Sequence, residues 1–153
     1  MSTRAKVVTV CAALNAEQVR YVLAGAQAGI LWGYARLTRD IDVVIDPTRE
    51  NAQRVLVALE SVGFQLARDY SAEALLARKI TVLTDPFYRV DIMTVAWSVQ
   101  YKDASARAQV FDIDGVRIPT LSLDDLIASK RTGRLQDAAD IEVLEQIRAR
   151  HQD

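Results

Sequence analysis

The segment 40–46, with the sequence DIDVVID, constrains the fold of this chain more than any other segment. Side chains along a β-strand alternate between the two faces of a sheet, so residues two positions apart point the same way. Asp40 and Asp42 therefore share one face, together with Asp46. The opposite face carries only β-branched apolar residues, Ile41, Val43 and Ile45. The pattern predicts a strand at 40–45 that buries its apolar face and turns two carboxylates, ~6–7 Å apart at Cα, toward a cleft.

A second run, Arg89–Met93, places Asp91 between two apolar residues in the same way. If this strand lies beside 40–45, three carboxylates meet on one face of the sheet. Carboxylates grouped in this way suit the divalent cations used in phosphoryl and nucleotidyl transfer. The chain has one cysteine and one histidine, which excludes a Cys/His zinc site. Oxygen ligands alone favour a hard ion, Mg²⁺ or Mn²⁺.

Gly25 separates an apolar strand, Tyr21–Ala24, from a small-residue segment that predicts a helix over Ala26–Tyr34. A glycine at such a junction lets the backbone approach an anion closely. The first turn of the helix, near Ala26 and Gln27, offers unpaired N–H groups and the positive end of the helix dipole. Phosphate groups are therefore expected between Gly25 and the acids, with a metal bridging them.

Hydrophobic periodicity and turn signals predict an alternation of helices and strands along the whole chain. The expected helices are a short one capped by Asn15, then Ala26–Tyr34, one from Asp46-Pro47 to Gly63, Ser71–Ala77, one from Ser122 to about 132, and one from about 135 to 150. The expected strands are Tyr21–Ala24, Asp40–Ile45, Phe64–Ala67, Lys79–Leu83, Tyr88–Met93, Gln109–Ile113 and Val116–Pro119. This order indicates an α/β (α+β) fold with a mixed β-sheet flanked by helices.

The composition sets limits on the class of protein. A chain of 153 residues predicts a single domain, 1–153, with closing helices at about 122–150. The net charge of −1 gives no overall basic field for long nucleic acids. The single cysteine, Cys11, excludes an internal disulfide and fits a reducing compartment. The apolar run Val7–Leu14 is short for a signal peptide, and no run reaches the ~20 residues of a membrane span, so a cytoplasmic protein without a membrane partner is expected.

Two tryptophans and one lysine have ordinary structural explanations beside their functional ones. Trp32 and Trp97 are expected in the core or on a partner surface, with base stacking as the alternative. Lys130 on a surface helix is by default a solvated lysine. The sequence gives no signal for an oligomeric state.

The motif Gly25-Ala26, followed after thirteen residues by Asp40-Ile41-Asp42, resembles the signature of the DNA polymerase beta-like nucleotidyltransferases. Asp91 matches the third carboxylate of that family. The segment 33–42 and the segments 118–130 and 133–140 are similar to its small bacterial and archaeal branch, which includes minimal nucleotidyltransferases and AbiEii-like toxins of toxin–antitoxin systems. The resemblance spans roughly 21–144 and implies the nucleotidyltransferase fold.

The resemblance also implies roles for individual residues. Asp40, Asp42 and Asp91 would be catalytic and ligate Mg²⁺ or Mn²⁺, and Asp91 would help activate the attacking hydroxyl. Lys130 would also be catalytic and would bind the nucleotide by neutralising the charge of the triphosphate. The remaining nucleotide-binding candidates are Gly25, Ala26, Arg36, Arg39, Asp137 and Asp140, of which Asp137 and Asp140 are alternatives for one further acid of the site.

The function implied is metal-dependent transfer of a nucleoside monophosphate from an NTP to a hydroxyl of RNA (tRNA) or protein, within a toxin–antitoxin system that supplies a cognate toxin or antitoxin partner. Ala26 stands where many active relatives have serine or glycine. The alternative is therefore a catalytically weak or inactive member that acts as a partner-binding module. A further alternative is a small-molecule nucleotidyltransferase.

Overall fold

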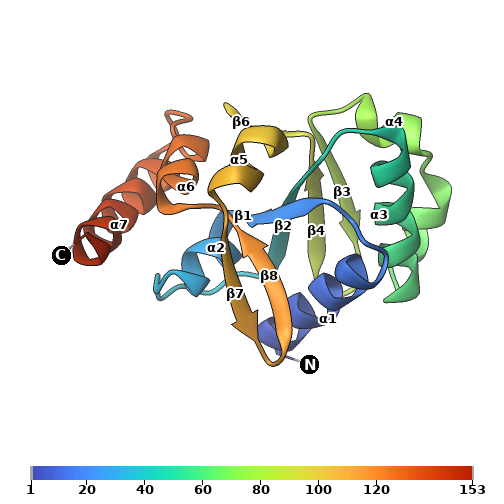
Figure 1. Ribbon diagram of the computed structural model, residues 1–153, viewed down its shortest axis with the longest axis horizontal. Helices are drawn as coiled ribbons and strands as arrows, with labels where there is room; N and C mark the ends of the chain where they lie inside the picture. Colours follow the sequence, from blue (N-terminus) through green and yellow to red (C-terminus); the bar gives the residue numbers. More distant parts are fainter. Residues whose placement is uncertain (1, 153) are drawn as a thin grey trace.

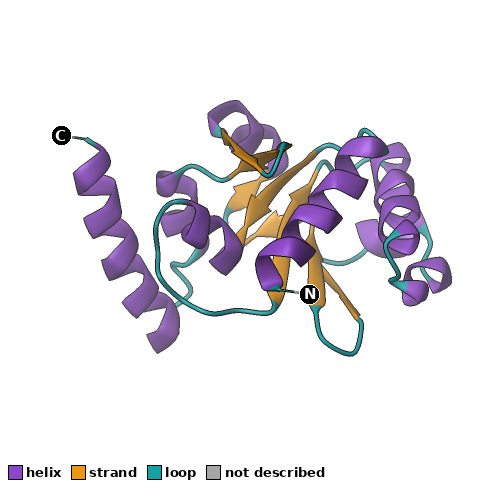
Figure 2. Cartoon of the chain, turned by 90° about the horizontal axis from the view of Figure 1, so that it is seen from below, coloured by secondary structure: helices purple, strands orange, loops and turns teal. Residues whose placement is uncertain are grey.

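The computed structural model describes residues 2–152, which form a six-stranded mixed sheet with helices packed around it (Figures 1 and 2). The strands of this sheet are β1 (Tyr21–Ala24), β2 (Asp40–Ile45), β3 (Ile80–Thr84), β4 (Arg89–Met93), β7 (Gln109–Ile113) and β8 (Val116–Thr120). Their order is β3-β4-β2-β1-β8-β7. A separate two-stranded hairpin contains β5 (Val95–Ala96) and β6 (Val99–Gln100). The predicted mixed sheet flanked by helices is confirmed.

The helices are α1 (Thr3–Ala16), α2 (Gly25–Leu31), α3 (Arg49–Ser61), the 3₁₀ helix η1 (Gln65–Asp69), α4 (Ala72–Leu76), α5 (Tyr101–Arg107), α6 (Leu123–Ser129) and α7 (Leu135–His151). Helices α1 and α3 contact each other, and α6 contacts α7. In Figure 1, α3 and α4 lie at one end of the molecule and α6 and α7 at the other. None of the helices within 2–152 is long and apolar enough to cross a membrane.

Strands β2 and β1 are the two central strands of the sheet, and the apolar residues of β2 are deeply buried. Ile41, Val43 and Ile45 are at most 1% exposed, whereas Asp40 and Asp42 are only half-buried. Strand β2 pairs antiparallel with β1 and parallel with β4. The alternation of apolar and acidic residues therefore places the core on one face and the acids on the other, as the sequence predicts.

The expected helix start at Asn15 is wrong. Helix α1 begins after Ser2, whose side chain accepts a hydrogen bond from the Ala5 amide, and Asn15 lies in its last turn. The Asn15 amide group instead donates to the Arg117 carbonyl and accepts from the Tyr21 hydroxyl. These contacts with β8 and β1 fix the end of the helix, and no local spacing rule reveals them.

Two further local predictions are wrong. Helix α3 is capped by Thr48 rather than by Asp46, because Asp46 forms an ion pair with Arg20 at 2.7 Å. The expected strand Phe64–Ala67 is replaced by the 3₁₀ helix η1. Phe64 is buried beside it, so its apolar character reflects packing and not pairing in a sheet.

Candidate functional site

Two of the predicted acids are direct neighbours in the sheet. In the parallel pairing of β2 with β4, Asp42 lies opposite Asp91 and Asp40 lies opposite Arg89. Paired residues on adjacent strands point to the same face, with the strands ~4.8 Å apart. The structure therefore brings together the three carboxylates that the sequence predicts on two separate strands.

Arg89 stands between these carboxylates. Its Nη2 lies 3.2 Å from Asp40 Oδ2, and its Nε lies 2.9 Å from Asp91 Oδ1. Nη2 also donates a hydrogen bond of 3.1 Å to Asp91 Oδ2. Arg89 was not predicted as a site residue, although its position two residues before Asp91 places both side chains on one face. The guanidinium supplies positive charge to an acidic group of side chains.

The charges of the acids are only partly balanced. Burial, and then the charge of Asp91, raises the pKa of Asp42 to about 7. Asp91 is 8% exposed, and its Oδ1 has one partner of opposite charge, Arg89 Nε at 2.9 Å, whose side chain is 45% exposed. A buried carboxylate oxygen of this kind is costly unless a cation or a proton satisfies it.

The donor chemistry of the acids fits a hard divalent cation. All three side chains line one cavity and offer carboxylate oxygens, the ligand atoms that such ions prefer. As the side chains stand in residues 2–152, no three acids, histidines or cysteines are grouped closely enough to hold a metal ion. Arg89 forms ion pairs with two of the acids, so binding of a cation requires its guanidinium to move aside.

Gly25 closes the site from the side of β1. Its φ of +63° lies in the left-handed region that favours glycine. A Cβ at this position would lie 1.9 Å from Asp42 Oδ2 and 2.8 Å from Asp42 Cγ. Position 25 therefore requires glycine for two reasons: its positive φ, and the lack of space for a Cβ beside the Asp42 carboxylate. Helix α2 is shorter than expected, seven residues, and ends at Leu31.

A basic group of side chains faces the acids from the α6–α7 segment. Lys130 follows the last residue of α6, and its Nζ lies 2.9 Å from Asp140 Oδ2 and 3.8 Å from Asp137 Oδ1. Arg36 Nη1 donates to the same Asp140 oxygen at 3.0 Å. The sequence left Asp137 and Asp140 as alternatives, and the structure brings both to Lys130, with Asp140 closer.

Asp140 is held by four donors while it is 1% exposed. The donors are Tyr34 Oη, Arg36 Nη1, Lys130 Nζ and Gln136 Nε2. Burial would raise the pKa of Asp140, but the hydrogen bonds from Lys130 and Tyr34 outweigh it, and the pKa is lowered. Asp140 is therefore a fixed anion that orients the two cationic side chains.

Asp137 has a different set of partners. It accepts hydrogen bonds from the Thr132 hydroxyl and from Arg134 Nε, the latter at 2.7 Å. Burial opposes ionisation of Asp137, but these hydrogen bonds prevail and its pKa is also lowered. Thr132 and Arg134 were not predicted, because only the fold of the α6–α7 connection brings them to the site.

A cavity of about 550 Å³ joins the acidic and basic groups. Nine predicted residues line it: Gly25, Ala26, Arg36, Asp40, Asp42, Asp91, Lys130, Asp137 and Asp140. Arg39, the tenth, is exposed and lines a second hollow of about 470 Å³ with Lys6 and Asp85. The structure therefore separates Arg39 from the other site residues. Residues that the sequence did not single out also line the cavity, among them Thr38, Ile80 and Met93.

The mixed sheet, with acids on adjacent central strands beside a left-handed glycine turn, defines the nucleotidyltransferase class of fold. The antigenic nucleotidyltransferase-like protein from Paracoccidioides brasiliensis is similar over 95% of this chain and 74% of its own, with 15% identity and a TM-score of 0.63. Lincosamide antibiotic adenylyltransferase LnuA, in its lincomycin-bound form, is similar over 85% of this chain and 88% of its own, with 21% identity and a TM-score of 0.53. A candidate nucleotidyltransferase from Thermotoga maritima is similar over 92% and 86%, with 18% identity and a TM-score of 0.54.

Residues 6–149 match the family model described as nucleotidyltransferase of unknown function (DUF6036). This chain belongs to that family, and the resemblance to the nucleotidyltransferase superfamily is confirmed. No curated protein sequence matches the chain significantly. Family and fold together support nucleotidyl transfer as the general class of reaction.

Proposed function

We propose that this protein is a metal-dependent nucleotidyltransferase that transfers a nucleoside monophosphate from an NTP to a hydroxyl group and releases pyrophosphate. One observation carries the proposal. Asp40, Asp42 and Asp91 share a cavity with Lys130 and other cationic side chains. An acidic side suits a divalent cation, and a basic side suits a polyphosphate.

The acids would hold Mg²⁺ or Mn²⁺ through Asp40, Asp42 and Asp91. When bound, the cation neutralises the charge of the reacting phosphate. In the reaction, the acceptor oxygen forms a bond with the α-phosphorus, and the bond from that phosphorus to the bridging oxygen of the β-phosphate breaks. The proton of the acceptor hydroxyl passes to a carboxylate, and Asp91 is the candidate because it lines the cavity beside Asp42 on the adjacent strand.

The basic side would bind the leaving pyrophosphate. Lys130 and Arg36 are both fixed by Asp140, so their positive charges are oriented before a nucleotide arrives. Arg134 lines the same side of the cavity. We also propose that residues 1–153 act as a single domain, because α6 and α7 supply the phosphate-binding half of a site whose acids lie on β2 and β4.

The acceptor that we propose is a hydroxyl of RNA, including tRNA, or of a protein, in a cytoplasmic toxin–antitoxin setting with a cognate partner. To test transfer, the protein is incubated with α-labelled NTPs, Mg²⁺ or Mn²⁺, and bulk tRNA or protein acceptors. Label is expected in an acceptor with the wild type and not with the Asp40→Ala, Asp42→Ala double variant. Equal signals from the two proteins would refute the proposal.

A small-molecule acceptor is a second candidate, because a structurally similar protein is an antibiotic adenylyltransferase solved with lincomycin. A panel of hydroxyl-bearing antibiotics in the same assay tests this candidate.

The third candidate function is a partner-binding module with weak catalysis. Ala26 supports it, since Ala26 lines the cavity without offering a hydroxyl to phosphate. Binding of a partner protein that persists in the double variant, with no transfer by the wild type, would favour this third candidate.

A further inference from the structure

Apart from the acidic and the basic side chains, a third group of residues lines the cavity, and this group is apolar. Beyond Asp91, strand β4 continues to Met93 on the same face, and the chain then forms the β5–β6 hairpin. Ile80 lies opposite Met93 in the pairing of β3 with β4 and is 47% exposed. Met93, Ile80 and Trp97 all line the cavity. The side chains of this apolar wall, Met93, Ile80 and Trp97, carry no charge to attract a phosphate.

Trp97 is the outermost residue of this wall, and its conformation is unusual. It begins the two-residue turn between Ala96 and Val99, and its φ is +57°. Such turns favour glycine, asparagine or aspartate, and a bulky aromatic residue there is an outlier. Strained residues of this kind gather at ligand sites, where the surrounding structure holds them. Trp97 is nevertheless 62% exposed.

The two tryptophans of the chain differ sharply. Trp32 donates its Nε1 hydrogen to the Leu121 carbonyl at 2.8 Å and packs edge-on against Phe111 and His151. The expectation of a packing role is therefore confirmed for Trp32. The indole of Trp97 has no ring stacking, hydrogen bond or cation contact with the part of the chain that the structure describes. Trp97 therefore lines the cavity with a largely exposed side chain.

We infer that Trp97 is the platform on which the base of the bound nucleotide stacks. This inference rests on the proposed function and assigns an orientation to the NTP. The triphosphate lies toward Lys130 and Arg134, the α-phosphate lies at the acids, and the base lies against the β5–β6 hairpin. Because every base presents a π-face, stacking alone gives affinity with little discrimination between bases. A volume of about 550 Å³ is within the usual range for a small-molecule site.

Fluorescence tests the contact directly. Trp32→Phe leaves Trp97 as the single tryptophan, and its emission is followed during titration with Mg·ATP. A quench is expected that saturates at the Kd measured by calorimetry. Magnesium tripolyphosphate has the same charged groups without a base, and it should bind without quenching. Heat of ATP binding without any quench would overturn the inference while leaving the proposed function intact.

Affinity gives a second test. Trp97→Gly removes the ring and suits the positive φ, so the turn is retained. The Kd for Mg·ATP is expected to rise about 5- to 100-fold, equivalent to ~1–3 kcal/mol. The Kd for tripolyphosphate is expected to stay unchanged, and Trp97→Phe should keep the ATP affinity within about threefold, since a ring remains. An unchanged ATP affinity in Trp97→Gly would overturn the inference.

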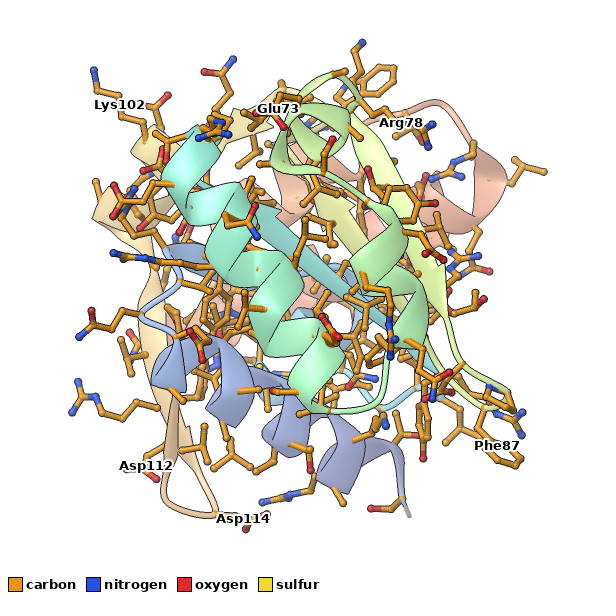
Figure 3. All side chains as sticks on the ribbon, turned by 90° about the vertical axis from the view of Figure 1, so that its right-hand side faces the viewer. Glu73, Arg78, Phe87, Lys102, Asp112 and Asp114 are labelled. Carbon is orange, nitrogen blue, oxygen red and sulfur yellow. The ribbon has the colours of Figure 1, made fainter. Side chains whose placement is uncertain are left out.

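Phe87 provides a matched control. It is 70% exposed at the β3–β4 turn and projects outward in Figure 3, away from the site cavity. Phe87→Ala should leave both affinities unchanged, and a loss equal to that of Trp97→Gly would count against a specific role of Trp97. If the wild type binds neither ATP nor tripolyphosphate, the proposed function fails, and the inference fails with it.

Discussion

Gly25 and Asp42 are in such close contact that a Cβ on Gly25 would lie 1.9 Å from Asp42 Oδ2. Asp42 lies on β2, whereas Gly25 is the first residue of α2 and directly follows Ala24, the register partner of Asp42 on β1. The glycine that would allow phosphate to approach thus also leaves room for Asp42, an acid of the proposed metal site. The two halves of the sequence motif depend on each other sterically.

Gly25→Ala should damage the site more than an ordinary glycine substitution. The left-handed φ alone costs a non-glycine residue ~1–2 kcal/mol, and the clash adds ~1–3 kcal/mol or displaces Asp42. Gly63→Ala is the control, because its φ is also positive, +99°, and no atom lies within 4 Å of its Cβ position. Urea unfolding measures the loss of stability, and a nucleotide titration measures the damage to the site. Equal losses in both variants would contradict the steric role of Gly25.

Asp140→Asn should destabilise the fold by ~2–4 kcal/mol, because the half-buried Lys130 and Arg36 lose their closest carboxylate, which is 1% exposed. Asp124→Asn is the control. Asp124 forms an ion pair of 2.7 Å with Arg148, but its side chain is 74% exposed, so the expected loss is below ~1 kcal/mol. Urea unfolding of both variants checks the difference. Similar losses would show that Asp140 is not the anchor of the basic group.

The stabilisation by Asp140 should depend on pH in a defined direction. Its pKa is lowered in the folded protein from a value of 3.8, so its contribution is full above the unfolded pKa and disappears as the pH falls through the folded one. The difference in unfolding free energy between wild type and Asp140→Asn should be constant from about pH 8 to 5 and shrink below about pH 4. A difference that persists unchanged at pH 3 would contradict the ionised, hydrogen-bonded state of Asp140.

Arg89→Met should strengthen the binding of Mn²⁺ in the absence of nucleotide, because Arg89 competes with the cation for Asp40 and Asp91. It should also lower the stability of the metal-free protein by ~1–2 kcal/mol. Arg107→Met is the control. Arg107 donates two hydrogen bonds to Asp125, away from the acids, so its loss should destabilise without changing Mn²⁺ affinity. Calorimetric titration with Mn²⁺ measures the affinity of each variant. Unchanged or weaker Mn²⁺ binding by Arg89→Met would refute the competition between Arg89 and the cation.

The elements that could be predicted from the sequence are those set by neighbouring residues, such as alternating strands and capped helices. Strand β2 has the predicted bounds because its β-branched residues set its length and the alternation of acidic and apolar residues over 40–43 sets the face of the acids. Ser71 and Ser122 cap their helices as predicted, each accepting a hydrogen bond from an amide three residues on. Asn15 has an equally good capping pattern, but its contacts with β1 and β8 override it.

The sequence predicts those site residues whose position depends only on the strand that carries them and on the face of the sheet to which they point. Asp42 and Asp91 needed only the assumption that their strands are neighbours. The ion pair of Arg89 with Asp40 depends on the register of β2 with β4, which no local pattern encodes. Arg36 and Arg39 looked equivalent in one loop, but the path of the loop takes Arg36 to Asp140 and turns Arg39 to the other hollow.

The central claim is that the acids and the basic side chains form one metal–nucleotide site, and calorimetric titration of ATP tests it most directly. The wild type should bind ATP with Mg²⁺ and lose more than about tenfold in affinity, ~1.4 kcal/mol, when the metal is chelated. The Asp42→Asn, Asp91→Asn double variant should lose this metal dependence. A double variant at Asp112 and Asp114, exposed acids of the β7–β8 hairpin labelled in Figure 3, should retain it. Metal-independent ATP binding, or equal binding by the wild type and the Asp42→Asn, Asp91→Asn variant, would contradict the account.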